Sequence, residues 1–333
     1  MSTITECLSQ VRLGEPQVHR NLVLFPLIAE KIAEPHYLLL DEALAQGCAR
    51  VTEVSESGSV PELSFINECD RPVLLLDGEE LVGAKQNRIL NLTVMAPAHK
   101  SIIIPVSCVE AGRWRAESAD FSSAKRAHYA TGRASKAAHV SASLRNSGTR
   151  RSDQSAVWRD ISEKSARMQA HSGSEAAAAM YQQHRASLDD FLQAFQPAEE
   201  QAGAMFAVNG RIVGLDLFDS PETLSSLLGK LVESYALDAI DAMQAGSEGA
   251  ATATDDPQVM LDDTAKAAVE RFPSVGEGED LRLHGERLTG GALVKEDRVI
   301  HFCAFRLQVR DNAADQEGSR FARASQRRSW WRH

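Results

Sequence analysis

Apolar and β-branched residues recur in short runs between polar turns over residues 49–110, which predicts closely spaced β-strands. Asp77-Gly78 predicts a type I′ hairpin turn, because both central residues of that turn need positive φ. Short turns favour a mainly antiparallel sheet over a βαβ winding. The predicted strands are Ala49–Val54, Val60–Ile66, Pro72–Leu76, Glu79–Ala84, Ile89–Val94 and Ser101–Glu110.

Helical patterns precede these strands and fill the middle of the chain. A capping box at Thr3 and Glu6 opens a short helix, and Asp41–Gln46 predicts another. Ser122–Gly148 is rich in Ser, Ala and Arg and has few large apolar residues, so we expect it to be irregular or mobile. Apolar stripes then predict a helix over 157–168, capped by Ser152 or Asp153, and one over 181–195.

The carboxy third returns to strands. Asn209-Gly210 predicts a hairpin between Ala204–Val208 and Arg211–Leu217, and Ser220-Pro221 begins a long helix. Residues 245–257 have the composition of a linker and precede a helix that we expect to reach Arg271. The last predicted strands are Leu281–Leu288, Ala292–Lys295 and Val299–Val309.

These patterns predict an α+β protein with an antiparallel β-rich amino half, a helical basic middle segment and an α+β carboxy half. We expect a β-rich domain over 15–118 that carries the site and a basic, partly irregular helical segment over 119–200. An α+β segment over 201–310 would pack on the first domain, and a disordered basic tail would occupy 311–333.

Composition is that of a globular protein: 333 residues, 43% hydrophobic and 25% charged, with no apolar run long enough to span a bilayer. The first six residues lack the basic and apolar regions of a secretory signal. The five cysteines are scattered and have no metal-ligand spacing. We therefore expect reduced thiols in a cytoplasmic protein that does not associate with membranes.

Charge is unevenly distributed along the chain. The net charge of -10 argues against nucleic-acid binding by the whole protein, yet residues 111–171 hold twelve Lys and Arg against five Asp and Glu. This basic segment could face an anionic ligand, a protein partner or an acidic surface of the same chain. The commoner explanation is a solvated basic surface.

The candidate site lies where polar groups interrupt apolar strands between Val73 and Trp114. Cys108 is a candidate nucleophile if Lys85, Arg88 or Arg113 stabilises its thiolate; the alternative is a small buried hydrophobe. Alternation along the strands would place Glu80, Gln86 and Arg88 on one face. Gly83 would mark a bulge or a close backbone contact.

Three carboxylates, Glu79, Glu80 and Glu110, could act together in acid–base chemistry or metal binding. The equal alternative is an ion-pair network with the nearby bases that fixes the sheet register. Gln86 and Asn87 offer amides suited to a base edge, a ribose or a bulged backbone. Arg113-Trp114 could hold a phosphate and stack on a ring, or could simply cap the core.

Two long motifs, Gly78-Glu79-Glu80-Leu81-Val82-Gly83-Ala84-Lys85-Gln86-Asn87-Arg88 and Pro105-Val106-Ser107-Cys108-Val109-Glu110-Ala111-Gly112-Arg113-Trp114, resemble those of a known family. It is the ARG- and rhodanese/phosphatase-superfamily-associated protein domain family, once listed only as a domain of unknown function. The resemblance extends through Gln154, Trp158 and Gly210–Phe218 and covers roughly residues 15–310. Its name implies gene neighbourhoods with ADP-ribosylglycohydrolases, and hence a role near NAD or ADP-ribose metabolism or in prokaryotic conflict systems.

We therefore expect binding or processing of a nucleotide-like anionic ligand. Cys108, Glu110 and Glu80 are the candidate catalytic residues, and Lys85, Gln86, Asn87, Arg88, Arg113 and Trp114 are the candidate ligand-binding residues. No metal site and no particular cofactor is predicted. The alternative is a non-enzymatic assembly module in which the polar cluster is structural and residues 122–148 become ordered on a partner.

Overall fold

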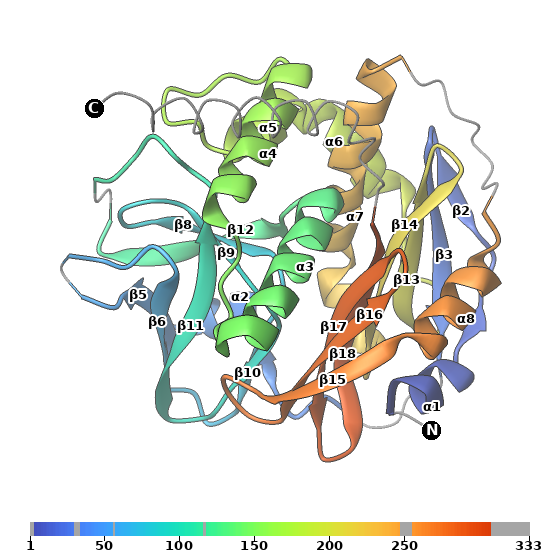
Figure 1. Cartoon of the computed structure of the whole chain (residues 1–333), viewed down its shortest axis with the longest axis horizontal. Coiled ribbons are helices and arrows are strands. Elements are labelled where there is room, and N and C mark those ends of the chain that lie inside the picture. Colours follow the sequence, from blue (N-terminus) through green and yellow to red (C-terminus); the bar gives the residue numbers. More distant parts are fainter. Residues whose placement is uncertain (1–2, 30–33, 56, 116–117, 247–254, 308–333) are drawn as a thin grey trace, which may run out of the picture.

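The structure, a computed structural model, describes residues 3–29, 34–55, 57–115, 118–246 and 255–307. Within these ranges the chain forms a closed β-barrel, a large antiparallel sheet, and helices that lie between and around them (Figure 1). The α+β class with a β-rich amino half is confirmed. No helix of the described part is long and apolar enough to cross a membrane.

The barrel is built from six strands in the order β11-β6-β5-β12-β8-β9. Apolar side chains that alternate along these strands fill its interior, among them Val51, Phe65 and Leu81. A small sheet, β10-β7-β4, lies beside it. The barrel strands are β5 (Ala49–Glu53), β6 (Glu62–Asn67), β8 (Glu79–Gly83), β9 (Arg88–Leu90), β11 (Lys100–Cys108) and β12 (Asp120–Ala127); the small sheet contains β4 (Leu38–Leu39), β7 (Val73–Leu75) and β10 (Val94–Ala96).

The large sheet joins strands from both ends of the chain, in the order β1-β3-β13-β14-β18-β17-β16-β15, with β2 paired to β3. Residues 15–118 therefore contribute to both the sheet and the barrel. The strands are β1 (Arg12–Leu13), β2 (Gln17–His19), β3 (Leu22–Ile28), β13 (Gln201–Val208), β14 (Arg211–Phe218), β15 (Ala268–Pro273), β16 (Glu279–Gly285), β17 (Leu288–Lys295) and β18 (Arg298–Arg306).

Helix α7 (Pro221–Gln244) packs against both β13 of the sheet and β12 of the barrel, so it ties the two together (Figure 1). Its start is the predicted one: Ser220 caps the helix and accepts hydrogen bonds from the backbone N–H groups of Glu222 and Thr223. The remaining helices are α1 (Thr3–Ser9), α2 (Leu40–Ala45), α3 (Ala130–Ser147), α4 (Gln154–Arg167), α5 (Ala178–Gln183), α6 (Arg185–Ala194) and α8 (Pro257–Lys266).

The prediction that residues 122–148 are irregular is wrong. They form the end of β12 and the 18-residue helix α3, which packs against α7 and against β17 and β18. The buried face of α3 combines small residues, Val140 and Leu144 with Arg133 and Lys136, which are both fully buried. Hydropathy assigns basic residues to the surface. It therefore does not predict a helix such as α3, whose cations are buried and paired inside the protein.

The turn at Asp77-Gly78 also differs from the predicted hairpin. Only Gly78 has positive φ there, and a hydrogen bond from Glu79 N to Leu76 O closes the turn. The strands on either side belong to different sheets, β7 to the small sheet and β8 to the barrel. By contrast, both Asn209 and Gly210 have positive φ, and the hairpin between β13 and β14 is confirmed.

Three further predictions need correction. The helix expected over 181–195 is broken at His184 into α5 and α6. The helix expected to reach Arg271 ends at Lys266 and is followed by strand β15. The prediction that all five cysteines are reduced thiols is wrong for two of them. Cys48 and Cys69 form a disulfide, since the antiparallel pairing of β5 with β6 brings the outer ends of the two strands together. The linker centre, 247–254, and the basic tail, 311–333, lie outside the described residues.

Candidate functional site

Most of the predicted site residues converge at one end of the barrel, which we call the barrel mouth. It consists of the turn from Ala84 to Asn87 between β8 and β9, the first residue of β9, and the chain that leaves β11. Because β9 pairs with β11, Arg88 lies directly opposite Cys108. The mouth contains Lys85, Gln86, Asn87, Arg88, Cys108, Glu110, Arg113 and Trp114.

Gly83 makes this turn possible. Its φ is +129°, and a Cβ atom there would lie 2.8 Å from the carbonyl oxygen of Asp120. The predicted close backbone contact is therefore present. The turn also explains why strand alternation fails beyond Gly83: Gln86 lies in the turn, and it does not share a strand face with Glu80.

Glu110 is the centre of a hydrogen-bonded frame. Its Oε2 accepts from the Arg113 guanidinium at 2.6 Å and from the Asn87 backbone N–H at 3.0 Å, and its Oε1 accepts from the Ser174 hydroxyl at 2.6 Å. Burial would raise the pKa of Glu110, but these donors outweigh it and hold the pKa below its usual range. Glu110 is therefore ionised near neutral pH and is suited to positioning Arg113 rather than to accepting a proton.

The two amide side chains complete this frame. Gln86 Nε2 donates to the Glu110 carbonyl at 2.9 Å, and its Oε1 accepts from Arg88 Nη1 at 3.0 Å. Asn87 Oδ1 accepts from Arg113 Nη2 at 3.0 Å. Both amides thus position the arginines of the mouth.

Cys108 and Arg88 face the barrel interior, on the same sides of their strands as the core residues Val106 and Leu90. Both are fully buried. Burial raises the pKa of the Cys108 thiol, and the nearby Arg88 charge only partly opposes this. Cys108 is consequently a thiol in this environment, which disfavours its predicted nucleophilic role.

Trp114 lies at the surface of the mouth. Its side chain is 49% exposed, and its ring centroid is 5.4 Å from Lys85 Nζ and 5.8 Å from Arg88 Cζ. A pocket of about 340 Å³ opens beside it, lined by Glu110, Gly112, Arg113, Trp114, Arg115 and Ser174. An indole, two guanidinium groups and a carboxylate thus meet in one open pocket.

The three predicted carboxylates do not form a set. Glu79 is paired with Lys230 at 2.5 Å, and Glu80 makes a bidentate ion pair with Arg126 at 2.7 and 2.8 Å. Only Glu110 belongs to the mouth. The ion-pair alternative is thus correct in kind, but Glu79 and Glu80 use cations outside the predicted list. In the described ranges no three His, Cys, Asp or Glu side chains gather as a metal site.

Several residues of the mouth were not predicted. Ser174 reaches it from the loop between α4 and α5, whose backbone pairs with residues 109–112. Gln154 binds the backbone of Cys108 through both atoms of its amide, each at 2.8 Å. Glu53, from the end of β5, accepts a hydrogen bond from Lys85 N. Gln154 was within reach of sequence reasoning, since it lies in the region of family resemblance.

A second polar cluster, which we call the α3 network, lies between the barrel and the large sheet. Arg133 donates to both oxygens of Asp216, at 2.6 and 3.2 Å, and to Asp77 at 3.2 Å. Lys136 pairs with the other oxygen of Asp77. His301 Nε2 lies 3.2 Å from Asp216, and its Nδ1 lies 2.8 Å from the Thr93 hydroxyl.

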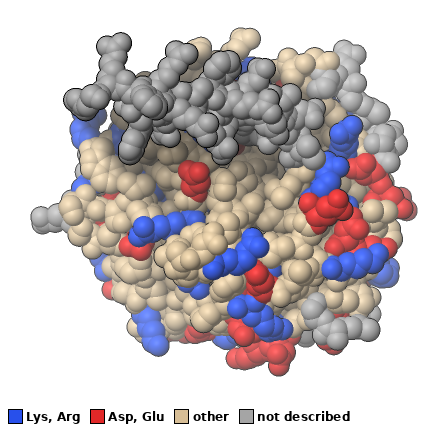
Figure 2. Space-filling view, in the orientation of Figure 1, with Lys and Arg blue, Asp and Glu red and all other residues tan. Residues whose placement is uncertain are grey.

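The basic middle segment is largely neutralised within the protein. Arg126, Arg133, Lys136 and Lys164 all pair with acidic residues from outside the segment, Lys164 with Asp238 and Asp241. On the coloured part of the face in Figure 2, basic and acidic side chains are interspersed. The buried bases of the segment therefore meet acidic residues of the same chain, whereas others, such as Arg115, Arg151 and Arg159, are exposed.

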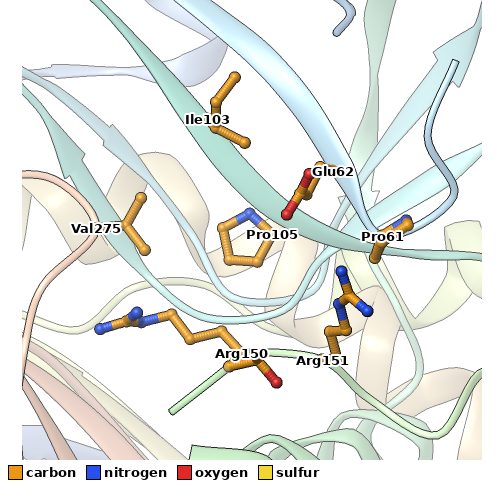
Figure 3. A pocket seen from close by; sticks show the side chains of 8 residues that line it. Pro61, Glu62, Ile103, Pro105, Arg150, Arg151 and Val275 are labelled. Atoms are coloured by element: carbon orange, nitrogen blue, oxygen red, sulfur yellow. The ribbon is translucent and has the colours of Figure 1, made fainter. Parts of the chain in front are cut away.

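A second pocket, of about 200 Å³, lies outside the barrel (Figure 3). It is lined by Pro61 and Glu62 at the start of β6, by Ile103 and Pro105 of β11, by 149–151 and by Val275. None of the predicted site residues lines it. Its most exposed apolar side chain is Ile103, at 50%.

Comparison with known proteins gives one family. The model of the ARG and Rhodanese-Phosphatase-superfamily-associated Protein domain matches residues 10–305, which is most of the chain. No curated protein and no solved structure matches. The matched range includes both the barrel mouth and the α3 network.

Proposed function

The chain belongs to the ARG and Rhodanese-Phosphatase-superfamily-associated Protein domain family, and we propose that its barrel mouth binds a small, nucleotide-like anionic ligand. The observation that carries this proposal is the pocket beside Trp114. A half-exposed indole offers a face for a planar ring, and Arg113 and Arg115 line the same pocket. A ligand with a planar ring and an anionic group could stack on Trp114 and pair with these arginines at the same time.

The electrostatics of the mouth support an anion. Four basic residues, Lys85, Arg88, Arg113 and Arg115, lie near Trp114 or line its pocket, and among the described residues Glu53 and Glu110 are the carboxylates whose charges act on Arg88. These bases outnumber these acids, in a protein whose overall charge is -10. Because low-dielectric walls strengthen such a local field, the mouth would attract an anion in spite of the negative total charge.

We propose binding as the primary activity rather than covalent catalysis. Glu110 is held as a carboxylate by Arg113, and Cys108 is held as a thiol by burial. The family name refers to ARG, which we interpret as ADP-ribosylglycohydrolase. We therefore propose that the ligand is related to ADP-ribose or NAD. The expectation of a cytoplasmic location is based on reduced thiols, and the Cys48–Cys69 disulfide removes that support, because such bonds persist mainly in oxidising compartments.

A second candidate is a non-enzymatic assembly module, and the hydrogen-bonded frame around Glu110 favours it. Both oxygens of Glu110 and both amides of the turn are already engaged within the protein. Residues 122–148 no longer support this candidate, because they are already ordered in the described structure. In this case Glu110→Gln and Cys108→Ala would change the melting temperature and leave cellular activity intact.

The proposal is tested by calorimetry with ADP-ribose, NAD and nucleoside phosphates at millimolar concentration. We expect at least one to bind, and Trp114→Ala to weaken that binding by roughly tenfold, the value of one stacking contact. Ile103→Ala is the matched control, because Ile103 is equally exposed but lies at the other pocket. No binding of any of these ligands, or equal binding by Trp114→Ala, would contradict the proposal.

A further inference from the structure

Arg88 is a buried cation with an open edge. Its Nη1 donates to Gln86 Oε1, whereas Nε and Nη2 are buried and have no hydrogen-bond partner. No carboxylate in the described ranges pairs with it; Glu53 and Glu110 act on it only through their charge. A buried charge without an ion-pair partner is unfavourable by several kcal/mol in general, and such groups are typical of functional sites.

The open edge has the geometry of a two-pronged donor. Nε and Nη2 project their N–H groups side by side, and this fork matches two oxygens of one oxyanion. In two other arginines of this protein, the same pair of nitrogens, Nε and Nη2, holds a carboxylate. Arg126 holds both oxygens of Glu80 with it, and Arg167 holds both oxygens of Asp241 at 2.8 and 3.1 Å.

Arg88 lies close to Trp114. Its Cζ is 5.8 Å from the centroid of the indole ring, and the same ring lines the open pocket, which Arg88 itself does not line. Trp114 is half exposed, so a ligand in the pocket can contact its ring. A ligand that displaced the ring by a few ångströms would reach Arg88 and lie among Lys85 and Arg113 as well.

We infer that the fork of Arg88 binds a phosphoryl group of the ligand, in a subsite close to Trp114. This inference rests on the proposed function and assigns one part of the ligand to one residue. A carboxylate would fit the fork equally well. The additional cations Lys85, Arg113 and Arg115 favour a phosphoryl group, because it carries more than one negative charge.

Calorimetry with sodium pyrophosphate on the full chain tests the subsite, with malonate as the carboxylate probe. We expect pyrophosphate to bind the natural protein more tightly than malonate does. Arg88→Met should weaken pyrophosphate binding by roughly tenfold or more, as for a lost charge-assisted pair, and Arg88→Lys should weaken it less. Arg271→Met is the control, because Arg271 is an exposed arginine of β15 that pairs with Glu279 of β16.

Two results would overturn the inference. One is that Arg88→Met, with a normal unfolding transition, binds pyrophosphate as tightly as the natural protein. The other is tighter binding of malonate than of pyrophosphate. If ADP-ribose or NAD also binds the natural protein and Arg88→Met with equal affinity, the Arg88 subsite is wrong while the proposed function stands. If the natural protein binds none of these anions, both are wrong.

Discussion

Arg88 and Arg133 are both fully buried, yet they differ in what surrounds them. Arg133 in the α3 network contacts two carboxylates and is paired on every nitrogen. Arg88 at the barrel mouth bonds a single neutral amide and leaves two nitrogens without a partner. The contrast separates a charge that is fully paired within the fold from one that we propose binds a ligand.

The two regions also differ in their connections. The α3 network ties the Asp77 turn, at the edge of the barrel, to Asp216 in β14 of the large sheet. The mouth is a local frame, built mainly from 83–88 and 108–114, that holds Arg113 firmly and leaves one edge of Arg88 free. The first region should therefore govern stability, and the second should govern binding.

Asp216→Asn should produce the largest effect on stability. The substitution leaves Arg133 and Lys136 buried with a single full carboxylate, Asp77, and removing one partner of a buried pair costs about 3–5 kcal/mol. Urea denaturation monitored by circular dichroism measures the change in the free energy of unfolding. A loss below about 1 kcal/mol would mean that the network is not structural.

Acid should weaken the α3 network in a defined range. Burial would raise the pKa of Asp216, but Arg133 and His301 hold it at about 2. The unfolded value is about 3.9, so the stabilisation is complete above about pH 4 and is lost as pH falls toward 2, a change of about 2.5 kcal/mol. Urea denaturation at pH 5 and pH 3 should show a steeper fall for the natural protein than for Asp216→Asn; equal falls would contradict the assignment.

Cys108 should react slowly with iodoacetamide in the folded protein. Burial raises its pKa, as it raises those of Cys7 to about 11 and Cys303 to about 12, so little thiolate exists near pH 7. Mass spectrometry of the modified peptides gives the rate at each site, with glutathione as the reference. Rapid alkylation of Cys108 at pH 6 would indicate a thiolate and restore its role as a nucleophile.

Sequence patterns located the mouth because its residues lie on adjacent strands joined by a short turn. Residues 83–88 and 108–114 come together through the pairing of β9 with β11. Apolar runs and turn residues in the sequence predict both strands. The hairpin at Asn209-Gly210 and the start of α7 follow from local chemistry in the same way.

The α3 network could not be predicted from local patterns. Arg133 pairs with Asp77 and Asp216, which lie 56 and 83 positions away in the chain, and nothing near Arg133 in the sequence indicates either partner. A hydropathy pattern treats buried, paired cations as solvent-facing, so α3 appeared irregular. The ion pair of Glu80 was missed for a related reason. Its partner, Arg126, lies on β12, in a stretch whose composition predicted irregular structure.

The most direct measurement compares Arg88→Met with Arg133→Met in urea denaturation without ligand. Arg133→Met should lose about 3–5 kcal/mol, since it leaves two carboxylates buried. Arg88→Met should lose less than about 1 kcal/mol, the value of the single bond to Gln86, or should gain stability. Equal, large losses for both variants would show that Arg88 stabilises the fold as Arg133 does, and would contradict a ligand site at the barrel mouth.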